Sequence, residues 1–126
     1  MIIGVGFDMV EIQRMESWAD DEVLRLRYFH REELDDMAIQ NKLISQSLAA
    51  RFAAKEAFGK ALGTGIRGFA LTDVRVVSDE LGKPELRLYD TALKRMRDRG
   101  GARAFLSLSH EKTYAGAVVV IEGTDG

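Results

Sequence analysis

The chain has 126 residues, of which 46% are hydrophobic and 30% charged, with a formal net charge of -2 and no cysteine. This length favours a single domain, 1–126, that can bury a real core. The near-neutral charge gives no case for nucleic acid or membrane binding, and the lack of cysteine excludes disulfides, thiol catalysis and thiolate metal sites. The apolar N-terminus is too short, and charged too early, for a signal peptide or a spanning helix, so we expect a soluble, cytoplasmic protein.

The first predicted element is a strand over 2–10 whose two faces differ in character. Large apolar side chains alternate on one face, at Ile3, Val5, Phe7 and Met9. The other face carries Gly4, Gly6 and Asp8, although glycine weakens a strand interior and aspartate is disfavoured there. This pattern predicts that another backbone or a ligand comes close beside Asp8. A strand end or a bulge at Gly6 is the alternative.

Two helical stretches are predicted next, over 13–29 and 32–39. Ser17 could cap the first one, with Asp20 and Asp21 in its first turn. This region carries several basic side chains, namely Arg14, Arg25, Arg27 and Arg31. They form either a solvated basic face or a docking surface for an acidic partner.

The longest predicted helix, over 45–65, carries charges among its apolar positions. A bulky stripe expected to face the core consists of Ile44, Leu48, Phe52, Phe58 and Leu62. Arg51 and Lys55 fall inside this stripe, so they need partners, because unpaired buried charges are costly. Glu56 lies at the edge of the stripe. Together with Lys60 it forms either an ordinary surface ion pair or part of a buried polar site that binds an anion through a metal.

Glycines follow this helix in the spacing G-x-G-x-x-G, at Gly63, Gly65 and Gly68. The dinucleotide-binding motif of that form follows a strand and opens a helix. These glycines instead follow a helix, as C-terminal caps do. We therefore reject a dinucleotide site and leave open a close approach of this turn to a ligand.

Two hairpins and one helix are predicted in the rest of the chain. The strands cover 72–78, 85–89, 104–110 and 114–121. Gly82 and Pro84 mark the first turn, and Asp90 is expected to cap a helix over 91–99. Ser109 beside His110 invites a serine hydrolase, but no nucleophile elbow is present, so we reject that activity.

Three separated segments together resemble one family. They are GVGFDMVEIQR, RFAAKEAFGKALGTGI and SLSHEKTYAGAVVVI. They look like holo-[acyl-carrier-protein] synthase, the small single-domain class of 4'-phosphopantetheinyl transferases, and the match covers nearly the whole chain. The resemblance implies an α+β fold with an antiparallel sheet packed on a long central helix. It also implies a homotrimer with active sites between subunits.

The resemblance further implies a reaction and its residues. Such enzymes move the 4'-phosphopantetheine group of coenzyme A to a serine of apo-acyl-carrier protein, release adenosine 3',5'-bisphosphate, and use Mg²⁺. Asp8 and Glu56 match metal-ligand positions, and Lys60 matches a lysine that faces the pyrophosphate, so these three are the catalytic candidates. Positions that line coenzyme A match Gly63, Gly65, Lys83, Pro84 and His110. Arg14 matches a basic position that docks the acidic carrier protein.

The chemistry is consistent with this set of residues. Mg²⁺ prefers oxygen ligands and keeps several waters, so Asp8 and Glu56 suffice. The serine nucleophile belongs to the partner, and either Glu56 or a metal-bound water could accept its proton. Arg51 is a further candidate for binding coenzyme A, because Arg51 and Lys55 could hold its 3'-phosphate or structural carboxylates.

Two rival hypotheses stand beside the enzyme. A non-catalytic coenzyme A-binding module would not need Asp8, Glu56 and Lys60 together, and a structural oligomer would not bind coenzyme A. Departures from the family are also visible, one of them being Phe7 and Met9 in place of the commoner aliphatic residues around Asp8. Gly59 stands where relatives often carry serine, and His30 replaces a frequent threonine, which we expect to weaken the cap of the helix over 32–39.

Overall fold

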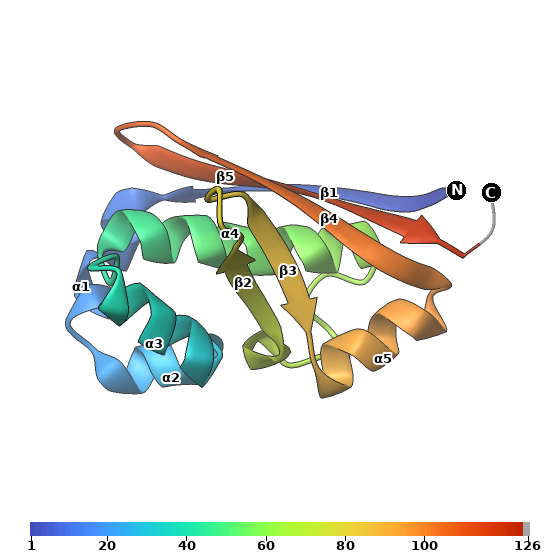
Figure 1. Ribbon diagram of the computed structural model, residues 1–126, viewed down its shortest axis with the longest axis horizontal. Coiled ribbons are helices and arrows are strands. Elements are labelled where there is room, and N and C mark those ends of the chain that lie inside the picture. The colour runs from blue at the N-terminus through green and yellow to red at the C-terminus, as the bar shows by residue number, and fades with distance from the viewer. Residues whose placement is uncertain (125–126) are drawn as a thin grey trace.

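The computed structural model describes residues 1–124, in which one strand is followed by a run of helices and then by two strand pairs separated by a helix (Figure 1). The strands are β1 (Ile2–Glu11), β2 (Val74–Ser78), β3 (Pro84–Leu88), β4 (Gly101–His110) and β5 (Tyr114–Gly123). The α-helices are α1 (Glu16–Ala19), α2 (Glu22–Tyr28), α3 (Arg31–Ile39), α4 (Ser45–Leu62) and α5 (Asp90–Asp98), with 3-10 helices η1 (Ile12–Met15) and η2 (Leu71–Asp73). The predicted α+β class is confirmed.

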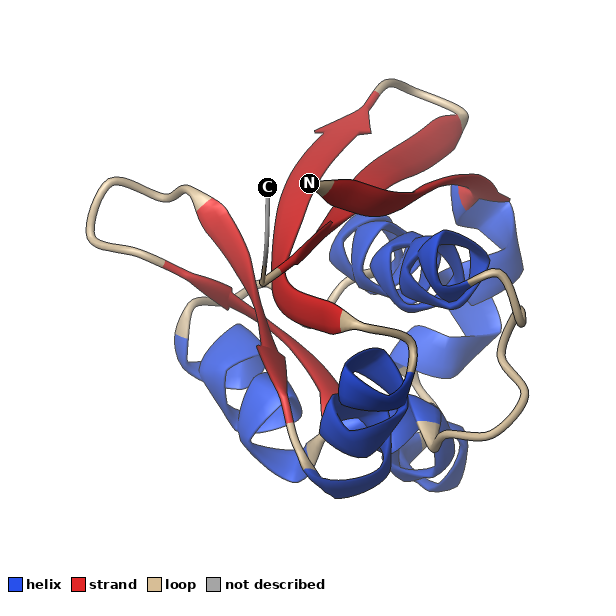
Figure 2. Ribbon diagram, turned by 90° about the vertical axis from the view of Figure 1, so that its right-hand side faces the viewer, coloured by secondary structure: helices blue, strands red, loops and turns tan. Residues whose placement is uncertain are grey.

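The strands form two separate antiparallel sheets (Figure 2). The larger sheet has the order β1-β5-β4, and the smaller one pairs β2 with β3. Both predicted hairpins are therefore confirmed. On β5, small and branched side chains alternate into the core, namely Ala115, Ala117, Val119 and Ile121, all of them buried. This face of the sheet packs on α4, as Figure 1 shows.

Helix α4 is almost completely covered by the rest of the domain. From Leu48 to Leu62 every residue is buried except Glu56 and Lys60. Full burial of a large apolar side chain such as Phe58 contributes about 1.5–3 kcal/mol, so the packing of this helix is a major source of stability. The helix ends at Gly63, which has φ 82° and donates its N–H to Lys60 O at 3.0 Å. The interpretation of Gly63 as a C-terminal cap is therefore confirmed.

Glycines in β1 allow α4 to lie directly against the strand. A Cβ atom at Gly4 would collide with the carbonyl oxygen of Ala61, and one at Gly6 with that of Ala57. The predicted close approach of another backbone at this strand is confirmed. It fixes the distance between Asp8 on β1 and the C-terminal half of α4.

The opposite side of the larger sheet remains exposed and apolar. On β1, Val5 is 60%, Phe7 54% and Met9 52% exposed. Val5 lies opposite Val120, and Val120 opposite Phe105 on β4, so these side chains share one face. We call this surface, made of Val5, Phe7, Met9, Phe105 and Val120, the outer sheet face.

The single helix predicted over 13–29 is wrong, because the structure divides it into η1, α1 and α2. The break falls at Asp20 and Asp21, which were expected inside the first turn. Asp21 instead caps α2, since its Oδ1 accepts a hydrogen bond from Leu24 N at 3.1 Å. Aspartate satisfies a free backbone N–H at a helix start, which favours a new helix over continuation of the old one. Ser17 lies inside α1 and caps nothing.

Two further caps differ from expectation. His30 does cap α3, because its Nδ1 accepts a hydrogen bond from Glu32 N at 3.1 Å. Asp90 does not cap α5. That role falls to Asp73 in η2, whose Oδ2 accepts from Thr91 N at 3.0 Å. Histidine ranks poorly among capping residues, so His30 was expected to make only a weak cap for α3. Asp73 belongs to η2 and not to the residues that directly precede α5, so local preferences did not point to it.

Candidate active site

The predicted catalytic residues meet where β1 crosses the C-terminal half of α4. Lys60 Nζ donates to Asp8 Oδ1 at 2.9 Å, and their side chains are 53% and 17% exposed. Glu56 precedes Lys60 by one helical turn and is half-buried. The structure therefore brings together all three candidates, and only Lys60 extends well into solvent.

The electrostatic surroundings of Glu56 are unusual for a glutamate on a helix. Burial and the neighbouring charge of Asp8 raise the pKa of Glu56, while Lys60 and Arg14 act in the opposite direction. A carboxyl group whose proton affinity is raised by burial and by a neighbouring carboxylate is typical of sites that bind a cation or transfer a proton. The exposed Arg14, on η1, is thus close enough to act on this group.

The donors at this point fit a magnesium ion better than a transition metal. Within residues 1–124, no group of three or more His, Asp or Glu side chains could enclose a metal. Asp8 and Glu56 supply carboxylate oxygens alone, which suits an ion that retains most of its water shell and adds substrate phosphates as ligands. Their closeness follows from the glycine contact between β1 and α4.

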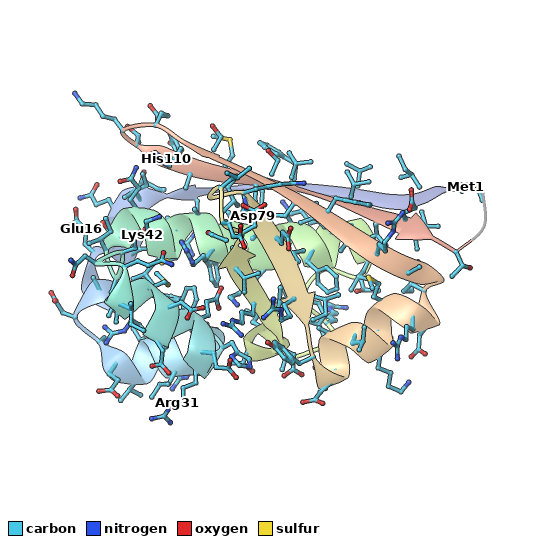
Figure 3. All side chains as sticks on the ribbon, viewed as in Figure 1. Met1, Glu16, Arg31, Lys42, Asp79 and His110 are labelled. Carbon is cyan, nitrogen blue, oxygen red and sulfur yellow. The ribbon has the colours of Figure 1, made fainter. Side chains whose placement is uncertain are left out.

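A second group of predicted residues lines a cleft of about 440 Å³ at the other end of α4. Arg51, Pro84 and His110 all contribute to its wall. The cleft also includes Lys42, which the sequence analysis missed. Figure 3 labels Lys42 and His110, which come from the loop before α4 and from the end of β4. A cleft lined by these basic side chains is suited to a phosphate group.

Gln46 holds the imidazole ring at the mouth of this cleft. Its amide nitrogen lies 3.1 Å from His110 Nε2. Gln46 stands in the first turn of α4, whereas His110 ends β4, so their contact ties the helix to the sheet. No sequence signal pointed to Gln46, because its partner lies 64 residues away.

Three other predicted residues lie outside the cleft. Lys83 is exposed and lines a separate groove between β3 and β4, although its neighbour Pro84 borders both. Gly63 and Gly65 lie in the turn after α4, next to Lys60 and away from the cleft. Gly65 N donates to Gly59 O at 3.0 Å, so this turn folds back on the helix.

The two cations that looked misplaced in the sequence are both buried. Lys55 is fully buried and donates to Glu33 Oε1 at 2.8 Å and to the carbonyls of Leu71 and Val74. Burial lowers the pKa of Lys55, and Glu33 opposes that shift. Of the two alternatives for Lys55, a structural carboxylate is the correct one.

Arg51 has a different environment, because it separates two cavities. It lines the cleft and also a polar cavity beside Arg75 and Asp36. Its Nη1 donates to Ser47 O at 3.4 Å, and its buried Nε has no partner within the described residues. A buried guanidinium with spare donors is suited to a phosphate in the cleft.

Within one chain, the carboxylate group and the cleft are separate. None of Asp8, Glu56 and Lys60 contributes to the wall of the cleft. Glu56 and Lys60 lie in the C-terminal half of α4, whereas the cleft lies at the first turns of this helix. A substrate that needs both must therefore span them or use two copies of the chain.

Comparison with known proteins agrees with this fold. A model of the 4'-phosphopantetheinyl transferase superfamily matches residues 4–119. The chain therefore belongs to the 4'-phosphopantetheinyl transferase superfamily. A holo-[acyl-carrier-protein] synthase from Treponema denticola is 52% identical to it, with 98% of this chain and 100% of the relative covered.

Solved structures show the same architecture. The crystal structure of holo-[acyl-carrier-protein] synthase from Neisseria meningitidis superposes with a TM-score of 0.87 at 38% identity, covering 97% of this chain and 99% of that one. The Helicobacter pylori holo-[acyl-carrier-protein] synthase in complex with coenzyme A gives a TM-score of 0.79 at 27% identity, covering 94% and 99%. Across residues 1–124, no helix is both long and apolar enough to cross a membrane.

Proposed function

We propose that this protein is an enzyme that transfers the 4'-phosphopantetheine group of coenzyme A to a serine of apo-acyl-carrier protein. The products are the holo-carrier protein and adenosine 3',5'-bisphosphate. The observation that carries the proposal is the meeting of Asp8, Glu56 and Lys60 where Glu56 and Lys60 interrupt the buried part of α4. A non-catalytic coenzyme A-binding module would not need these three groups together, and the relatives named above are synthases.

The reaction breaks one phosphorus–oxygen bond of the pyrophosphate and forms another. The serine oxygen of the carrier attacks the phosphorus that bears the pantetheine arm, and the bridging oxygen leaves with adenosine 3',5'-bisphosphate. Asp8 and Glu56 would hold the Mg²⁺ ion, which when bound neutralises charge on the phosphate oxygens. Lys60 adds a cation beside the same oxygens. Glu56, whose pKa is raised by burial, would accept the serine proton.

The cleft is the proposed site for the nucleotide end of coenzyme A. Arg51, Lys42 and His110 would bind its 3'-phosphate, because they are basic groups on one cleft wall. The turn with Gly63 and Gly65 lies away from the cleft of its own chain, so it would line the nucleotide from a neighbouring subunit. Lys83, which lies in the neighbouring groove, retains a role only if the substrate extends past Pro84.

A homotrimer would join the two separated groups. The outer sheet face supports self-association, since monomers rarely expose a contiguous apolar patch of this kind. In this arrangement, the cleft of one subunit faces the carboxylates of its neighbour. Phe7→Lys on the outer sheet face should yield monomers by sedimentation analysis and abolish transfer, whereas a monomeric wild type would contradict the proposal.

A complementation experiment tests the shared site directly. His110→Ala removes a cleft residue and Glu56→Gln a carboxylate, so each variant alone should be nearly inactive. When both are co-expressed, some mixed interfaces combine an intact cleft with intact carboxylates, and activity should return. If every site lay within one subunit, co-expression would restore nothing.

The acidic carrier protein would dock beside Arg14. This arginine is exposed, and its charge already acts on Glu56, so a carrier bound there would bring its serine near the carboxylates. Arg14→Glu should raise the KM for the carrier and leave the KM for coenzyme A unchanged. Arg97→Glu, an exposed site on α5, serves as the charge-matched control.

The central test is the mass gain of an apo-acyl-carrier protein incubated with coenzyme A. Wild type should transfer the group with Mg²⁺ and stop when a chelator is added. Asp8→Asn and Glu56→Gln should each lose on the order of 100-fold or more, the size of effect seen for electrostatic groups at a transition state. Asp98→Asn, an exposed carboxylate paired with Lys94, is the control that should change nothing. Transfer by wild type that resists chelation, or full activity of both variants, would refute the metal assignment.

A further inference from the structure

Lys60 binds the carboxylate that the metal also needs. Its ammonium group lies 2.9 Å from Asp8 Oδ1, and Glu56 is close enough to interact with both charges. Without a metal, Lys60 is therefore the cation that neutralises this carboxylate pair. A second cation can bind Asp8 directly only against the repulsion of the ammonium group, which is strong at such short separations.

The side chain of Lys60 is free to leave. It is 53% exposed, and the four-carbon stem of lysine is flexible. Asp8, by contrast, is 17% exposed and sits on a strand held against α4 by the glycine contact. Of the two partners, only the lysine can move without disturbing the fold.

We propose that the Lys60–Asp8 ion pair makes metal binding depend on coenzyme A. Lys60 holds Asp8 until a pyrophosphate draws the ammonium group onto its own oxygens, and Asp8 and Glu56 then bind the metal tightly. This inference rests on the proposed function, because coenzyme A is the source of that pyrophosphate. It assigns Lys60 a role in the order of binding in addition to its contact with phosphate.

The consequence is reciprocal. If coenzyme A raises the affinity for the metal, the metal raises the affinity for coenzyme A by the same factor. The enzyme would then keep little metal in its empty state. Both substrate and ion would be bound together, and the carboxylates would be neutralised at every stage.

The experiment measures metal binding alone, with no turnover. Mn²⁺ is titrated by calorimetry into full-length wild type, Lys60→Met, Lys60→Arg and Lys94→Met, without coenzyme A. Lys60→Met should bind Mn²⁺ about tenfold more tightly, a coupling of ordinary size for linked sites. Lys60→Arg, which keeps the charge, should stay near wild type.

Lys94→Met is the matched control. Lys94 also forms an ion pair with a carboxylate, Asp98, at 2.7 Å on the exposed surface of α5. Its removal changes the net charge equally but leaves the site intact, so Mn²⁺ affinity should not change. Thermal melts of each variant establish that it is folded, and Lys60→Gln repeats the test with a polar neutral side chain.

A repeat of the titrations with coenzyme A completes the test. Coenzyme A should increase Mn²⁺ affinity more in wild type than in Lys60→Met, because the variant has no ion pair to release. The proposal is overturned if Lys60→Met and Lys60→Gln bind Mn²⁺ no more tightly than wild type. This outcome is distinct from failure of the proposed function, which the mass-gain assay on wild type decides.

Discussion

Two ion pairs on helix α4 have nearly the same length but opposite surroundings. Lys55 and Glu33 are 2.8 Å apart with both side chains fully buried. Lys60 and Asp8 are 2.9 Å apart, with the lysine side chain 53% exposed. The two lysines are separated by little more than one helical turn. The two distances alone do not distinguish the pairs, whereas burial places one pair inside the core and leaves the other open to solvent.

The buried pair is a hub of the fold. Glu33 also accepts a hydrogen bond from Val76 N at 2.9 Å, and Lys55 Nζ lies 5.2 Å from the centre of the Phe29 ring. The pair therefore connects α3, α4 and β2 at one point. The exposed pair has no such connections, so a ligand can separate it without disturbing the core.

The largest expected effect comes from breaking the buried pair. Lys55→Met should reduce the free energy of unfolding by about 3–5 kcal/mol, because it leaves the Glu33 carboxylate buried without the cation that pairs with it. Lys60→Met should change it by at most about 1 kcal/mol, as is usual for exposed pairs. Urea unfolding of both variants measures the difference. Equal losses would show that burial does not distinguish the two pairs.

A second change should partly reverse the first. In the Lys55→Met background, Glu33→Gln removes the unpaired charge while its amide oxygen can still accept from Val76 N. We expect it to recover about 1–3 kcal/mol, the range of interaction energies between contacting residues. The double-mutant cycle by urea unfolding gives this value. No recovery would mean that the buried charge is not the cause of the loss.

A smaller effect is expected where α4 ends beside the exposed pair. A Cβ atom at Gly59 would lie 2.5 Å from Gly65 O, so Gly59→Ala must push the glycine turn away from the helix. Overpacking of this kind costs about 1–3 kcal/mol, and we expect weaker coenzyme A binding as well. Unfolding and calorimetry check both effects. Unchanged stability would imply that the turn moves freely, and relatives with serine here should hold the turn further out.

The smallest effect is expected at Glu111, a carboxylate that is bound by backbone N–H groups. Backbone N–H groups of Thr113 and Tyr114 hydrogen-bond to Glu111 and lower its pKa below the ordinary 4.5. The ionised form is therefore favoured in the folded state. Its stabilisation is complete above pH 4.5 and disappears as the pH falls through the lowered value. Melting temperatures of wild type and Glu111→Gln should differ at neutral pH and converge in acid; a constant difference would contradict this.

Local chemistry made several elements readable from the sequence. The glycine-and-proline turn predicted the β2–β3 hairpin, and the glycines of β1 predicted a close contact beside Asp8. Gly63 was recognisable as a helix end because its position follows the last apolar residue of α4. Each of these features depends on neighbours a few residues away, so it can be recognised from the order of the residues in the sequence.

Other elements could not be read because their partners are remote in the chain. The α5 cap is Asp73, 18 residues before Thr91, and the partner of Lys55 is 22 residues away. His30 was expected to make a poor cap, but its ring is held by stacking on Tyr89, with centroids 4.5 Å apart, and it accepts from Glu32. Lys42 escaped notice because a lone lysine in a loop carries no local sign of a cleft.

The sequence by itself determined which chemical groups this protein carries and where its hairpins and its longest helix form, since spacing and turn residues act over short distances. The tertiary structure alone decided what each charge on α4 does. Lys55 is covered by α3 and β2, while Lys60 faces β1 at an edge left open to solvent. The sequence of a helix does not show which elements will cover each of its sides. The elements packed on α4 therefore decide that one ion pair is part of the core and that the other is open to solvent.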